Sequence, residues 1–91
     1  MPLEQIKMLG YRYDSPKVLC MVGNATPEIL SELKPEFKIG DWFLSEAIET
    51  IFGHHVQIYG PYTEMNEALQ DAHKRFGVTS FRDSLSELTY T

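Results

Sequence analysis

The stretch from Gly40 to Val78 carries the clearest local signals in the chain: a helix, a short strand, a Gly-Pro turn and a second helix. Its charge pattern is equally distinctive, because no Lys or Arg occurs between Lys38 and Lys74. The same stretch holds six acids, Asp41, Glu46, Glu49, Glu64, Glu67 and Asp71. The sequence therefore predicts two amphipathic helices that bury their apolar sides and expose acidic ones.

The first of these helices is predicted over residues 41–52. Asp41 is a suitable N-cap, and Gly53 suits the left-handed residue that closes a helix. At about 100° per residue, one broad apolar face is formed by Phe43, Leu44, Ala47, Ile48, Ile51 and Phe52. Trp42 falls on the polar side instead, close to Glu46 and Glu49. A Trp among acids is unusual for a residue that serves only the core.

The second helix is predicted over residues 64–76. Thr63 follows the Gly60-Pro61 turn as an N-cap, and Gly77 ends the helix. Its buried stripe consists of Met65, Ala68, Leu69, Ala72 and Phe76. The acids of this helix, Glu64, Glu67 and Asp71, lie together on the opposite side.

The rest of the chain supplies a hairpin and shorter elements. Residues 11–13, extended back toward Ile6, are predicted to pair with 18–22, although residues 2–9 also suit a short helix. A helix is predicted over 27–34, a strand over 55–59 and a last short helix after Ser80 through Phe81, Leu85 and Leu88. Residues 1–91 are thus expected to form a single α+β domain. Its predicted architecture is a small, mostly antiparallel sheet of about three strands with three to four helices packed mainly on one face.

Charge and composition exclude several classes of function. The net charge of −5 comes entirely from residues 41–91, which argues against binding nucleic acid through phosphates or binding an anionic membrane. The longest unbroken apolar run has five residues, and the N-terminus lacks the pattern of a secretory signal. A lone cysteine, Cys20, excludes an internal disulfide and fits a reducing compartment. We therefore expect a cytoplasmic protein whose partner is a protein with a basic surface.

No residue set points to catalysis, a cofactor or a metal. His54 and His55 are neighbours on a predicted strand, so their side chains point to opposite faces and cannot share one metal ion. They are instead candidates for pH sensing or, with Tyr59, for a ligand site. Cys20 lies inside the most apolar run, where a core role is favoured over that of a nucleophile.

One segment resembles a known module. Residues 56–68, in which Gly60-Pro61-Tyr62 precedes a helix, are similar to a strand–turn–helix of the SPOR peptidoglycan-binding domain. The paired repeat of that family is missing, so neither its function nor its residues are carried over.

These observations favour a non-enzymatic protein-binding module, a regulator, adaptor or inhibitor of a type common among phage and mobile-element proteins. Its predicted docking surface is Trp42 with the acids Glu46, Glu49, Glu64, Glu67 and Asp71, in which Trp anchors and the acids steer a basic partner. Alternatively, Trp42 folds back over residues 37–39. Two other functions stay open: a homodimer with a ligand or catalytic site near His54, His55 and Tyr59, and a structural subunit that pairs through a sheet edge at 11–13 or 56–58.

Overall fold

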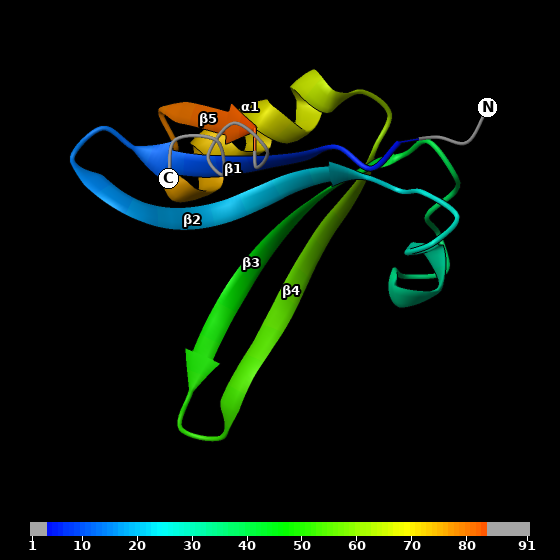
Figure 1. Ribbon diagram of the computed structural model, residues 1–91, viewed down its shortest axis with the longest axis horizontal. Helices are drawn as coiled ribbons and strands as arrows, with labels where there is room; N and C mark the ends of the chain where they lie inside the picture. Colours follow the sequence, from blue (N-terminus) through cyan, green and yellow to red (C-terminus); the bar gives the residue numbers. More distant parts are fainter. Residues whose placement is uncertain (1–3, 84–91) are drawn as a thin grey trace.

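The computed structural model describes residues 4–83, apart from the side chains of Ile48, Glu49 and Asp83. In this range the chain forms a five-stranded antiparallel sheet with one α-helix (Figure 1). The elements are β1 Lys7–Arg12, β2 Ser15–Asn24, the 3-10 turn η1 Leu30–Glu32, β3 Trp42–Thr50, β4 Gly53–Tyr62, α1 Met65–Phe76 and β5 Ser80–Asp83. The strand order is β4-β3-β2-β1-β5. The predicted architecture of about three strands and three to four helices is therefore wrong.

The main correction concerns residues 41–52, which form a strand and a turn rather than a helix. β3 pairs antiparallel with β2 on one side and with β4 on the other. The carboxylate of Asp41 accepts from the Lys38 backbone N–H at 2.9 Å, so it closes the turn before β3 instead of capping a helix. Gly53, with φ of 118°, lies at the hairpin turn instead of a helix end. Aromatic and β-branched residues suit strands well, and pairing with two neighbouring strands outweighs a helical spacing of apolar residues.

Two other predicted helices are also wrong. Residues 27–34 contain only η1, and the hydroxyl of Thr26, directly before this stretch, donates to the Gln5 side-chain oxygen at 3.0 Å. Residues 80–83 form β5, which pairs antiparallel with β1. The remainder of that predicted helix, with Leu85 and Leu88, lies outside the described residues.

The helix predicted over 64–76 and the first hairpin are confirmed. α1 begins with a capping box in which Glu64 is the N-cap, one residue beyond the predicted Thr63, and Glu67 closes the box. It ends at Gly77, whose φ of 72° is the left-handed conformation expected of that residue. β1 pairs antiparallel with β2, and the strand predicted over 55–59 lies within the longer β4.

The core lies between α1 and one face of the sheet. Ala68 and Ala72 are fully buried, and these small side chains let the helix approach the sheet closely. They pack with Cys20 and Val22 from β2, Leu44 from β3 and Val78 after the helix. Because side chains alternate along a strand, Met21 and Ser45 face the opposite side, which among residues 4–83 is covered by no α-helix and only at one end by η1. We call this side the open face.

Part of the β3–β4 hairpin extends beyond the rest of the sheet. β2 pairs with β3 only from Asn24↔Trp42 to Met21↔Ser45, whereas β3 and β4 stay paired as far as Thr50↔Gly53. The two strands therefore leave the body as a ribbon that points away from β2 and α1 (Figure 1). We call residues 46–57 the arm. Its four further pairs beyond Glu46↔Gln57 give it a length of about 13 Å, at roughly 3.3 Å per residue.

Candidate protein-binding surface

The tip of the arm exposes two large apolar side chains. Ile51 is 93% exposed and Phe52 is 92% exposed. On the flank of the same arm, Val56 is 61% exposed. Single exposed apolar residues are ordinary on protein surfaces, but a pair at the end of a projecting ribbon is of the kind that marks a contact site.

The tip is held in one shape by hydrogen bonds across its turn. The Thr50 hydroxyl donates to the Gly53 carbonyl at 3.0 Å and accepts from the Phe52 backbone N–H at 3.2 Å. Gly53 supplies the positive φ at which an L residue would be strained. Because the turn is fixed before any contact is made, less conformational entropy is lost when Ile51 and Phe52 are covered.

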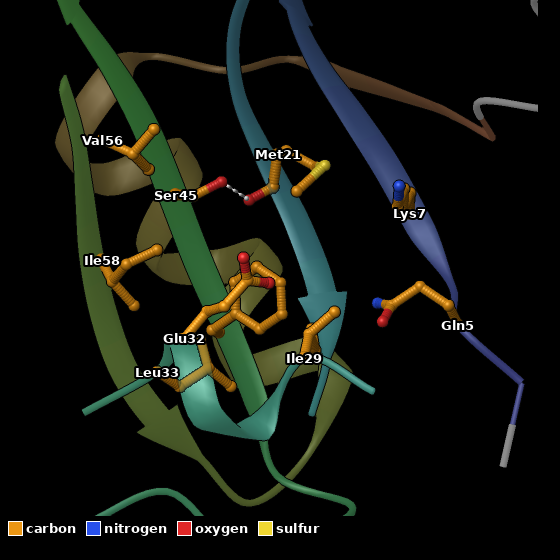
Figure 2. A pocket seen from close by; sticks show the side chains of 10 residues that line it. Gln5, Lys7, Met21, Ile29, Glu32, Leu33, Ser45, Val56 and Ile58 are labelled. Atoms are coloured by element: carbon orange, nitrogen blue, oxygen red, sulfur yellow. Dashed lines mark hydrogen bonds between the residues drawn. The ribbon is translucent and has the colours of Figure 1, made fainter. Parts of the chain in front are cut away.

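The open face carries an apolar hollow beside the base of the arm. Its volume is about 440 Å³, and β1 to β4 and η1 contribute to its walls (Figure 2). Its apolar lining is Met21, Ile29, Leu33, Phe43, Val56 and Ile58, and its polar lining is Gln5, Lys7, Glu32 and Ser45. Figure 2 shows η1 crossing the lower end of the strands, with Glu32 and Leu33 above the sheet. The volume lies within the range of about 300–1,000 Å³ usual for binding sites.

A smaller hollow continues this apolar surface toward the arm. It measures about 180 Å³ and shares Met21, Ser45 and Val56 with the larger one. Ala47 and Val56 are directly opposite one another in the arm. Two positions along each strand toward the body, the next pair on that face is Ser45↔Ile58. The open face thus runs without interruption from the hollow onto one side of the arm.

The predicted docking residues come from two elements, because Trp42, Glu46 and Glu49 belong to β3 whereas Glu64, Glu67 and Asp71 belong to α1 and its N-cap. Trp42 is in β3, is partly buried and packs against the core cluster, so the premise of a Trp on a polar helical face is wrong. Glu46 stands at the base of the arm and accepts from the Tyr59 hydroxyl at 3.4 Å. Glu64 and Glu67 form the capping box of α1. The side chain of Glu49 is outside the described residues.

Asp71, the sixth docking candidate, belongs to a polar network that joins α1 to β4. It accepts from the Tyr62 hydroxyl and from Arg75 Nε, the latter at 2.8 Å, and the Arg75 guanidinium lies 4.4 Å from the centre of the Tyr59 ring. Burial by itself would raise the pKa of Asp71, but the hydrogen bonds from Tyr62 and Arg75 and the positive charge nearby hold that pKa below its ordinary value. The pKa of the Tyr62 hydroxyl is raised, mainly by burial and secondly by its hydrogen bond to Asp71. The network joins α1 to β4, and the Asp71 carboxylate is already used as an acceptor for Tyr62 and Arg75.

The ligand-site candidates are likewise not brought together. His54 and His55 are exposed, successive residues of the arm, whereas Tyr59 faces the helix and meets Phe76 edge to face with ring centres 6.0 Å apart. Neither hollow of the open face includes any of these three residues in its lining. Among the residues that the structure describes, no three His, Cys, Asp or Glu side chains gather closely enough to hold a metal ion.

Cys20 is in the core, as predicted. It is 3% exposed, and burial, with a smaller contribution from the charge of Glu46, raises the pKa of its thiol to about 11. A thiol of that kind is a poor nucleophile at neutral pH.

The predicted sheet edges are half right. β4 is an outer strand, so residues 56–58 do lie at an edge, but β5 covers the outer side of β1 and removes the edge expected near Tyr11.

Sequence reasoning missed Ile51 and Phe52 as surface residues because it placed them on a buried helical face. The connection between β3 and β4, Ile51-Phe52, contains none of the Gly, Asn or Asp residues that mark a two-residue hairpin turn. A weak local signal is Gly53, which directly follows this connection and suits a turn as well as a helix end.

Comparison with known proteins adds no family. No protein-family model, curated protein or solved structure matches the chain. The similarity of residues 56–68 to the SPOR domain accordingly stays confined to that segment. Within residues 4–83, no helix is long and apolar enough to cross a lipid bilayer.

Proposed function

We propose that the chain is a non-enzymatic protein-binding module, a regulator, adaptor or inhibitor that acts in the cytoplasm and contacts its partner with the tip of the arm. The observation that carries this proposal is the pair Ile51 and Phe52, both more than 90% exposed at the end of a hydrogen-bonded turn. Large apolar side chains that enter a pocket on a partner typically dominate the energy of an interface.

The acidic charge of residues 41–91 supports a partner with a basic surface. Eight of the thirteen acids and only three of the eight basic residues lie in residues 41–91, which include the arm. We therefore propose a partner that offers an apolar cleft bordered by Lys or Arg. Electrostatic attraction would accelerate the encounter and weaken with added salt.

The arm also has a physical reason to be covered. A two-stranded ribbon has little stability of its own in water, and all of its residues from 50 to 57 are exposed. A partner that covers the ribbon would stabilise it in the paired form, because binding to the folded state alone shifts the equilibrium toward that state.

Affinity capture with matched variants tests the proposal. The tip variant is Ile51→Ser with Phe52→Ser, and the control is Tyr13→Ser, which removes an aromatic side chain that is 89% exposed in the turn between β1 and β2. We expect the tip variant to lose its partner, with at least a tenfold rise in Kd, and the Tyr13 variant to retain it. Equal capture by all three proteins would refute the arm as the binding element.

A further inference from the structure

We infer that, in the absence of another partner, the tip of the arm is held by a second copy of the chain, in the hollow on that copy's open face. This inference rests on the proposed function, since it names what covers the same tip and so controls its availability. The two copies would exchange arms reciprocally.

The geometry of one chain requires the occupant of the hollow to come from another molecule. Ile58 lines the hollow and lies five residues along β4 from Gly53 at the turn. At roughly 3.3 Å per residue this is about 16 Å along a straight ribbon. The tip cannot fold back into its own hollow without breaking the β3–β4 ladder.

The shape and chemistry of the hollow match the tip. Six of its ten lining residues are apolar, and the tip offers one aromatic and one branched aliphatic side chain. A cavity of about 150 Å³ is enough to take up a benzene ring. A hollow of about 440 Å³ therefore has room for the Phe52 ring and the Ile51 side chain together.

A two-fold symmetric arrangement places both tips in hollows at the same time. The tip and the hollow lie at the two ends of the same side of the β3–β4 hairpin, with the Ala47↔Val56 and Glu49↔His54 pairs between them. When two such faces are laid together antiparallel, each tip meets the hollow of the other copy, and the Ala47 and Val56 side chains of both copies meet near the axis. This is a closed, isologous dimer, which does not extend into a filament.

The area available is that of a modest specific interface. One aromatic side chain buries about 150–250 Å². Two tips, the hollow walls that they cover and the two Ala47–Val56 surfaces together bury on the order of 1,200 Å², which is the lower end for specific stable complexes. Each copy carries a net charge of −5, so the copies repel one another and added salt should strengthen the dimer.

Sedimentation equilibrium of the full chain at several concentrations tests the inference. Four proteins are compared: the wild type, the tip variant Ile51→Ser with Phe52→Ser, the hollow variant Leu33→Lys and the control Tyr13→Ser. Leu33 lines the hollow, lies outside the arm, is partly exposed and does not belong to the core cluster under α1, so its replacement does not disturb the core. We expect the wild type and the control to dimerise. Their dimers should become tighter as the salt concentration rises from about 20 to about 500 mM, because salt screens the repulsion between two copies of net charge −5. The tip and hollow variants should each dimerise at least tenfold more weakly.

Mixing the two defective variants supplies the specific check. The tip variant keeps an intact hollow and the hollow variant keeps an intact tip, so their heterodimer regains one seating that neither homodimer has. We expect more heterodimer than either homodimer at equal concentration. No gain on mixing, or a wild type that stays monomeric at several hundred micromolar, would overturn the inference.

The outcomes separate this inference from the proposed function. If the wild type is monomeric but the tip variant still loses its captured partner, the tip binds another protein and only the inference falls. If the tip variant changes neither dimerisation nor capture, both fall.

Discussion

At the scale of single residues, Cys20 provides a test of the core. The burial that raises its thiol pKa from an ordinary value near 9 to about 11 lowers the thiolate population at pH 8 by roughly a hundredfold. We expect a thiol reagent to modify the native protein at least a hundredfold more slowly than the protein in denaturant. Modification of the native protein at the unfolded rate would show that β2 is not packed beneath α1.

The Asp71 carboxylate gives a second prediction, on the dependence of stability on pH. Because its pKa is lower in the folded state than its ordinary value, its contribution is complete above the unfolded pKa near 3.9 and is lost as the pH falls through the folded pKa. Asp71→Asn should reduce the free energy of unfolding at pH 7 by about 1–2 kcal/mol, since it weakens hydrogen bonds to a charged group.

Urea unfolding at pH 7 and at pH 2.5 measures this effect. The difference between wild type and Asp71→Asn should shrink at the lower pH, because the contribution of the charge is lost as the pH falls through the folded pKa. Gln70→Ala, an exposed neighbour on α1, is the control and should show no such convergence. An equal difference at both pH values would contradict the role given to the charge.

At the scale of the elements, α1 could be predicted from the sequence and β3 could not. The helix has a cap, a closing glycine and a single apolar stripe, and these local features agree with its tertiary contacts. Residues 41–52 have an N-cap candidate, a glycine and a helical spacing too, but all three are used differently: Asp41 closes a turn, Gly53 forms a hairpin and Phe43 and Leu44 point to opposite faces of a sheet. The deciding contacts are with β2 and β4, which no local pattern reveals.

The turn at Gly53 gives a prediction for the arm alone. Gly53→Ala places an L residue at φ of 118°, at a cost of about 1–3 kcal/mol. We expect amide hydrogen exchange within residues 46–57 to become faster, while exchange in α1 stays unchanged.

Gly40→Ala is the matched control for that variant. Gly40 also has a positive φ, and at both positions the added methyl group meets open space, so only the backbone strain is shared. The Gly40 variant should leave exchange in the arm unaltered. Faster exchange in the arm of both variants, or of neither, would mean that the arm is not an independently opening unit.

At the scale of the whole molecule, the sequence could not predict that one face of the sheet packs against α1 while the other carries the apolar hollow. The sequence correctly indicates an antiparallel hairpin, a buried Cys20 and one helix against a sheet. It does not give the strand order, because pairing partners far apart in the chain are chosen by the shared core. The sequence therefore predicts the binding residues on helices, whereas the structure presents its most exposed apolar pair at the end of a ribbon.

The central claim is that the arm tip meets protein, and photo-crosslinking tests it most directly. A photoreactive phenylalanine analogue replaces Phe52 in one protein and Tyr13 in another, since the two side chains are similarly exposed. Each protein is irradiated in extract from its native host, and the adducts are mapped by mass spectrometry. The account predicts discrete protein adducts at position 52 and not at position 13. The same background of adducts at both positions would contradict it.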